Sequence, residues 1–70
     1  MTGDASRISA QFDWAMGQAL RQTRLAAGAR TERARDAALR QRDAAMAVAA
    51  TLLGVARDRG VRIPSMENRP

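Results

Sequence analysis

Apolar residues recur at helical spacing through two long segments of this chain, which a short break at residues 28–30 separates. In the first segment they recur every three to four residues, the period of one helix face. The positions on this face are Ile8, Phe12, Ala15, Met16, Ala19, Leu20 and Ala26. The pattern predicts an amphipathic helix over about residues 5–27, with this face in the core.

Capping residues indicate where the helices begin and end. Asp4 or Ser6 can cap the first helix, and Gly28 is a natural stop. Thr31 is placed to cap a second helix, with Glu32 in its first turn, where the helix dipole favours an acid. A connection of about three residues favours an antiparallel helical hairpin. The alternative is one uninterrupted helix, because a single Gly costs only about 1 kcal/mol relative to Ala.

The second segment, residues 31–59, carries two apolar stripes. Both alternate spacings of four and three residues and lie roughly a third of a turn apart. One stripe is Ala34, Ala38, Gln41, Ala45, Val48, Leu52 and Val55, and the other is Leu39, Arg42, Met46, Ala49, Leu53 and Ala56. A hairpin supplies one neighbour and covers one stripe. We therefore expect two hairpins to dimerise into a four-helix bundle. The expected oligomer interface is Ala38, Ala45, Met46, Val48, Leu52, Leu53 and Val55.

The second helix has a clear C-terminal signal. Arg57 and Arg59 lie in its last turn, Gly60 follows, and Val61 can fold back onto Val55 or Ala56 in a Schellman-type ending. Pro64 prevents simple continuation of the helix. Residues 60–70 are therefore expected to be an irregular C-terminal tail of a single domain spanning 1–70.

Size and composition strengthen the expectation of an all-α oligomer. At 70 residues the core is marginal without a disulfide, a metal or a partner chain, and the sequence contains no Cys and no His. The longest uncharged run, residues 44–56, is well short of the roughly 20 apolar residues that span a bilayer. No signal-peptide pattern opens the chain, so we expect a cytoplasmic protein without a membrane span.

The charge is concentrated around the break between the helices. All 12 basic residues are Arg, 7 acids oppose them, and the net charge is +5. The cluster near the break is Arg21, Arg24, Arg30, Arg33, Arg35, Arg40 and Arg42. Asp36 with Arg40, and Glu32 with Arg35, have the spacing of surface ion pairs, which indicates a solvated face. The other interpretation is nucleic-acid binding through Arg24, Arg30, Arg33 and Arg40.

Two groups of residues are candidates for binding a protein partner. Trp14 lies off the main face of the first helix, with Arg21 and Leu25, in a combination typical of interaction hot spots. Trp14 could equally complete the dimer core or pack against the tail. The second group is Arg35, Leu39 and Arg42, where charges flank an apolar stripe.

The segment Gly17–Gly28, GQALRQTRLAAG, resembles the opening helix of Cro/repressor-type helix-turn-helix domains. In that family a short helix and a Gly-containing turn follow. Here the long helix from Thr31 departs from the pattern, and no recognition helix is expected after it.

Catalysis has no support in the sequence. The sequence contains no His that could activate Ser6, Ser9 or Ser65 as a nucleophile, and it contains no Gly-rich phosphate-binding motif. We expect neither catalytic nor metal-binding residues, no cofactor and no small-molecule substrate. The sequence predicts a non-enzymatic, homodimeric helical protein that binds another protein as a regulator, inhibitor or assembly factor. The alternatives are a nucleic-acid-binding regulator that uses the arginine-rich bend, and a structural subunit of a larger bacterial or phage complex.

Overall fold

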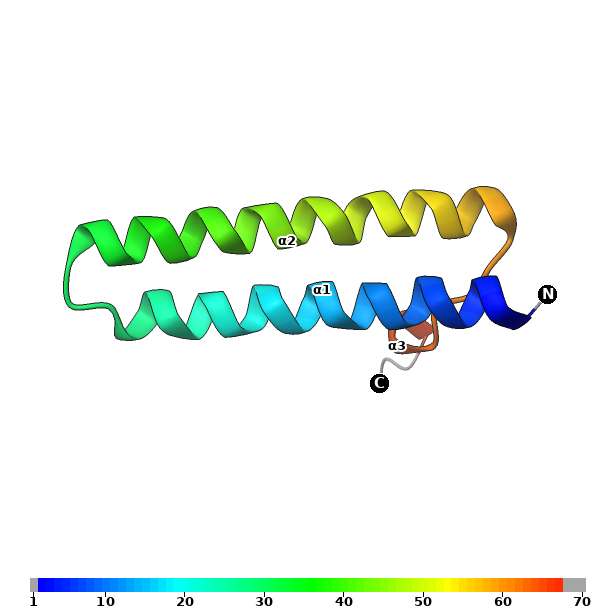
Figure 1. The fold of residues 1–70 in the computed structure, drawn as a ribbon, viewed down its shortest axis with the longest axis horizontal. Helices are drawn as coiled ribbons and strands as arrows, with labels where there is room; N and C mark the ends of the chain where they lie inside the picture. Colours follow the sequence, from blue (N-terminus) through cyan, green and yellow to red (C-terminus); the bar gives the residue numbers. More distant parts are fainter. Residues whose placement is uncertain (1, 68–70) are drawn as a thin grey trace.

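In the computed structural model, which describes residues 2–67, two long helices lie antiparallel and a short helical turn follows them (Figure 1). Helix α1 spans Thr2–Gly28, α2 spans Glu32–Arg59 and α3 spans Pro64–Glu67. The chain reverses at residues 29–31, and α1 and α2 pack side by side. The predicted all-α hairpin is confirmed, and the alternative of one uninterrupted helix is wrong.

Helix α1 begins earlier than predicted. It starts at Thr2, so Asp4 and Ser6 lie inside the helix and cap nothing. Asp4 still occupies the first turn, where the helix dipole favours a carboxylate. Its Oδ2 accepts a hydrogen bond from Arg59 Nη1 at 3.4 Å, which links the start of α1 to the end of α2.

Of the two helix ends at the bend, only the start of α2 has the predicted capping geometry. Gly28 ends α1 as its last helical residue, but its φ is not positive. Ala29 N donates to Ala26 O at 3.3 Å in the turn that follows. Thr31 caps α2 as predicted: its backbone is extended, and its Oγ1 accepts from Ala34 N at 3.1 Å.

The end of α2 is the predicted Schellman motif. Gly60 has a left-handed backbone, with φ 66° and ψ 27°. Gly60 N donates to Arg57 O at 3.2 Å, and Val61 N donates to Ala56 O at 2.8 Å. These bonds satisfy carbonyls at the end of the helix and turn the chain back toward α1.

The C-terminal segment, which has no regular secondary structure over residues 61–63, contributes to the core. The buried cluster at the open end of the hairpin is Ile8, Phe12, Ala15, Ala49, Ala56 and Ile63. Ile63 is only 4% exposed, and Pro64–Glu67 form the helical turn α3. Pro64 is compatible with this turn because the first helical position needs no N–H donor. Residues 68–70 of the expected tail lie outside the described residues.

Toward the bend, the seam between α1 and α2 is made of alanines. The buried residues there are Ala19, Ala26, Ala38 and Ala45. Small side chains let helix backbones approach closely. Met16 and Leu20, which were predicted to lie in the core, are instead 39% and 55% exposed. They lie at the edge of the apolar face, where a seam filled by alanines leaves larger side chains outside.

The two stripes of α2 share one neighbour. The buried residues Ala38 and Ala45 come from the first stripe, whereas Ala49 and Ala56 come from the second. Helix α1 therefore packs between the stripes and covers the inner edge of each. This corrects the expectation that one whole stripe stays uncovered, and it buries Ala38 and Ala45 within the hairpin.

Candidate interaction surfaces

The first surface is a groove along one side of the seam, here called the Trp14 groove. Its lining is Trp14, Gln18, Gln22, Gln41, Ala44, Ala45 and Val48. The hollow measures about 180 Å³, and none of these residues carries a charge. Trp14 is 64% exposed and Val48 is 46% exposed, so the groove presents apolar side chains to its surroundings.

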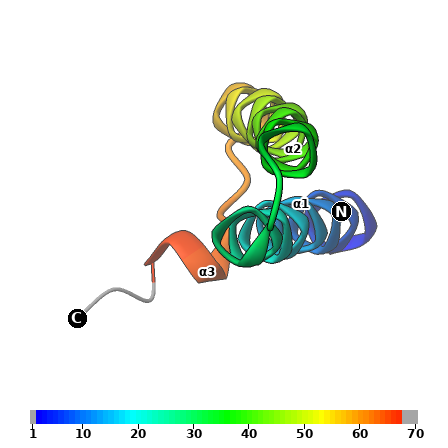
Figure 2. The same cartoon turned by 90° about the vertical axis from the view of Figure 1, so that its left-hand side faces the viewer.

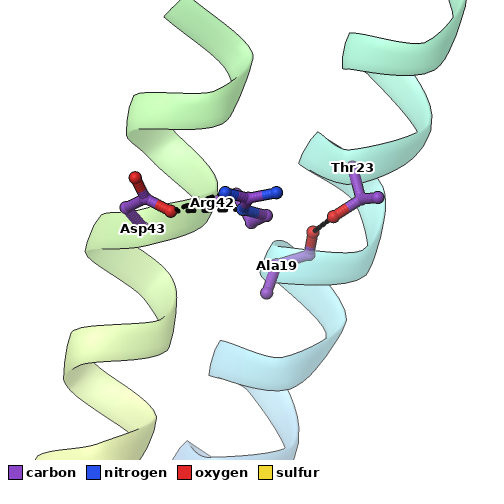
Figure 3. A network of polar contacts seen from close by, with 4 residues as sticks. All are labelled: Ala19, Thr23, Arg42 and Asp43. Carbon is purple, nitrogen blue, oxygen red and sulfur yellow. Dashed lines mark hydrogen bonds and ion pairs between the residues drawn. The ribbon is translucent and has the colours of Figure 1, made fainter.

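A second groove, here called the Arg42 groove, runs along the other side of the seam and measures about 430 Å³. Its lining is Met16, Ala19, Leu20, Thr23, Arg42, Asp43 and Met46. Figure 3 shows Arg42 reaching from α2 toward α1, where Thr23 and Ala19 lie. Arg42 Nε and Nη2 donate to Asp43 Oδ1 at 3.2 and 2.9 Å. Thr23 Oγ1 donates to Ala19 O at 2.8 Å, so its hydroxyl is satisfied within α1.

The C-terminal segment lies on the same side of the hairpin as the Arg42 groove. Figure 2 shows the chain descending from α2 and α3 lying beside α1. A hollow at the open end is lined by Val61, Ile63 and Met66 together with Leu53, which belongs to the same stripe as Arg42 and Met46. No residue of this segment lines the Trp14 groove. The chain therefore covers part of one side of the hairpin with its own C-terminal segment.

A third surface, here called the Leu–Arg face, lies on α1 alone. It is a hollow of about 340 Å³ lined by Gly17, Leu20, Arg21, Arg24 and Leu25. Leu20 and Leu25 are each 55% exposed. Gly17, Arg21 and Arg24 lie roughly half a turn around α1 from the buried Ala15, Ala19 and Ala26, so this face points away from α2.

The residues predicted to bind a partner are divided among these surfaces. Arg21 and Leu25 come together on the Leu–Arg face, whereas Trp14 lines its own groove. Arg42, of the second predicted group, lies on the other side of the seam. Leu20 was predicted to lie in the core, and neither Gly17 nor Gln22 was predicted to take part in binding. The two grooves at the seam depend on the rotation of α1 against α2, for which sequence spacing contains no signal, whereas the Leu–Arg face is formed by residues of α1 alone.

The predicted oligomer-interface residues are likewise divided. Met46 and Val48 are exposed in different grooves, and Leu52, Leu53 and Val55 are half-buried against the core cluster. Val48 is therefore the exposed member of this set that shares a groove with Trp14.

Positive charge is concentrated in the half of the hairpin nearer the bend. Residues 17–43 contain seven Arg and three acids, a net +4, whereas the remaining described residues contain four of each and are neutral. Six of those seven arginines are exposed and make neither an ion pair nor a hydrogen bond with the described residues: Arg21, Arg24, Arg30, Arg33, Arg35 and Arg40. The ion pairs expected between Asp36 and Arg40 and between Glu32 and Arg35 do not form. Exposed pairs of this kind gain too little to hold two long side chains in place.

Among residues 2–67, no three acids lie close enough together to hold a metal ion. No helix in this part of the chain is both long and apolar enough to cross a membrane. Comparison of the chain with protein-family models, curated proteins and solved structures finds no match. Function is therefore inferred from the three surfaces and the charge at the bend.

Proposed function

We propose that this protein is a non-enzymatic helical interaction protein that forms a homodimer and binds another protein, as a regulator, inhibitor or assembly factor. The observation that carries this proposal is the large apolar surface outside the core. Trp14, Met16, Leu20, Leu25, Met46 and Val48 are all at least 39% exposed. Apolar side chains that are exposed together on a surface are typical of protein–protein contacts and of other binding grooves.

The Trp14 groove suits a second copy of the chain. Identical copies each carry a net charge of +5, so arginine-rich surfaces repel each other. The Trp14 groove has no charge, and its Gln18, Gln22 and Gln41 amides both donate and accept hydrogen bonds. A two-fold contact places the same patch on both copies, which such self-complementary groups can satisfy. Trp14 of one copy would then pack against Val48 of the other, forming a four-helix bundle.

The test compares two residues of nearly equal exposure that lie in different grooves. Val48 in the Trp14 groove is 46% exposed, and Met46 in the Arg42 groove is 45% exposed. Light scattering should give the mass of a dimer for the native chain and for Met46→Glu. Val48→Glu should be monomeric, because it buries a carboxylate without a partner. Circular dichroism checks that both variants remain helical. A folded native monomer, or equal effects of the two variants, would refute the proposed dimer.

Binding of a protein partner is tested by capture experiments with the same purified protein. Trp14→Ala, which removes the groove's largest side chain, should abolish dimerisation and weaken capture while leaving helicity intact. Loss of helicity in Trp14→Ala would instead assign Trp14 to folding of the hairpin. A poorly folded native monomer would mean that another protein supplies the missing half of the core.

The second candidate function is nucleic-acid binding at the bend, which the six unpaired arginines and the net +4 favour. Contacts with phosphates release counterions, so affinity falls steeply as salt rises. Replacing Arg33 and Arg40 by Gln should then reduce the salt dependence. Arg7→Gln at the open end is the control and should leave it unchanged. Purification free of nucleic acid at low salt would remove this candidate.

A further inference from the structure

We propose that the Leu–Arg face of α1 docks an acidic amphipathic helix of a partner protein. This inference rests on the protein-binding function proposed above and specifies the chemistry of the partner. The face consists of Gly17, Leu20, Arg21, Arg24 and Leu25. It points away from α2 and shares no lining residue with the Trp14 groove, where the proposed dimer would form.

Gly17 gives this face its shape. A Cβ built at Gly17 would meet no atom within 4 Å, and the residue itself places no side chain in the hollow. Leu20 and Leu25, each 55% exposed, lie toward the two edges of the face around it. Apolar side chains of a partner can enter above Gly17 and contact both leucines. This arrangement matches the way an amphipathic helix inserts its apolar face into a groove.

The charges select an acidic partner. Arg21 and Arg24 are exposed and make no ion pair or hydrogen bond with the described residues, and the hollow contains no acid. Asp13 lies one turn earlier along α1 and lines a different hollow, with Arg62. A partner that carries carboxylates beside its apolar residues would satisfy both guanidinium groups and both leucines. A phosphate backbone would satisfy the arginines and leave Leu20 and Leu25 against water.

The partner segment is expected to be helical because α1 offers it side chains alone. The backbone N–H and C=O groups along the middle of α1 are used within the helix, so they cannot pair with an extended strand. Binding must therefore proceed through side-chain packing, for which the facing element is another helix.

The experiment measures binding of labelled synthetic helices to the 70-residue chain by fluorescence anisotropy at physiological salt. The first probe carries Leu at i, i+3, i+4 and i+7 with Glu on both flanks. The second has the same Leu residues with Lys in place of Glu, and the third is a single-stranded oligonucleotide. We expect the acidic probe to bind and the other two to bind at least about tenfold more weakly.

Two pairs of variants locate the site. Arg24→Glu and Gly17→Gln should each weaken binding of the acidic probe about tenfold, the first by reversing a charge and the second by filling the hollow. Gly17→Gln also raises helix propensity, so its effect cannot come from unfolding. The controls, Arg7→Glu and Gly3→Gln, make the same changes near the open end of the same helix. Both residues are exposed, and both controls should bind as the native chain does.

Three results would overturn the inference. They are failure of the acidic probe to bind, equal weakening by Arg7→Glu and Arg24→Glu, and preferential binding of the oligonucleotide. Equal weakening by the two Arg variants would mean that the probe binds through non-specific charge attraction. Preferential binding of the oligonucleotide would assign the arginines to nucleic-acid binding. Light scattering and protein capture on the same samples test the proposed dimer and protein binding independently of the acidic probe. An intact dimer that still captures protein but ignores the acidic probe would refute this inference alone.

Discussion

Alanine sets the spacing of this hairpin at the scale of single residues. Ala19, Ala26, Ala38 and Ala45 fill the seam near the bend, whereas Ile8, Phe12 and Ile63 supply the large buried side chains at the open end. Burial of a large aliphatic or aromatic side chain contributes about 1.5–3 kcal/mol, far more than a buried Ala. Stability is therefore concentrated at the open end, where the C-terminal segment completes the core.

Ile63→Ala should lower the free energy of unfolding by about 2–4 kcal/mol, because it leaves a cavity in the core cluster. Urea denaturation followed by circular dichroism measures the change. Met66→Ala on the same segment is the control, since Met66 is 37% exposed, and it should have a much smaller effect. Equal effects of the two variants would mean that Ile63 does not pack in the core in solution.

Thr31→Ala should destabilise the protein by about 1 kcal/mol, because the hydrogen bond to Ala34 N is lost at the start of α2. Thr51→Ala provides the comparison within the same helix. Thr51 Oγ1 donates to Ala47 O at 3.0 Å in the middle of α2, where Ala is the better helix former. Thermal unfolding should therefore show a lower Tm for Thr31→Ala and an equal or higher Tm for Thr51→Ala.

At the scale of elements, the C-terminal ends of α1 at Gly28 and of α2 at Gly60 have different backbone conformations. Gly28 closes α1 with an ordinary helical backbone, whereas Gly60 adopts the left-handed conformation that reverses the chain after α2. The reversal brings Ile63 back to the core and places α3 beside α1 (Figures 1 and 2). Gly60 is thus the residue through which the end of α2 controls the packing of the C-terminal segment.

Gly60→Ala should destabilise the protein by about 1–2 kcal/mol, because a Cβ is disfavoured in the left-handed conformation. Gly28→Ala should be neutral or stabilise by up to about 1 kcal/mol, since its φ is not positive and an added Cβ meets nothing within 4 Å. Denaturant midpoints of the two variants measure the difference. Equal midpoints would indicate that the Schellman turn is not maintained in solution.

At the scale of the whole molecule, positive charge is concentrated toward the bend, whereas one of the apolar grooves is uncharged. The half nearer the bend carries a net +4, and the Trp14 groove carries no charge. Salt should therefore have opposite effects on the contact between two copies of this chain and on the contact with an anionic partner. Screening relieves repulsion between identical positive copies and weakens attraction to an anionic partner.

The proposed homodimer should tighten as salt rises, because its interface is uncharged while the copies repel each other. Sedimentation equilibrium at low and at physiological salt measures the dissociation constant, which should fall as salt increases. Binding of the acidic helix should change in the opposite direction in the same buffers. A dimer that dissociates on addition of salt would indicate ion pairs at its interface and exclude the Trp14 groove.

The sequence by itself determined the two long helices and most of their ends. The helical period of the apolar positions, the Thr31 cap and the Gly60 ending are local, since each depends on residues within one or two turns. The hairpin followed from the short connection. The start of α1 was missed because Asp4 and Ser6 have cap-forming side chains, whereas the helix begins at Thr2 and includes both residues.

The tertiary structure decided which face of each helix is used. Rotation of α1 against α2 places the seam between the two stripes of α2, leaves Leu20 outside and makes Trp14 part of a groove shared with α2, whereas Arg21 and Leu25 line a hollow on α1 alone. The burial of Ile63 likewise depends on a gap that both helices form together. Sequence spacing defines angles around one helix axis. The relative rotation of two helices is a property of their packing, so the surfaces available to partners became visible only in the folded hairpin.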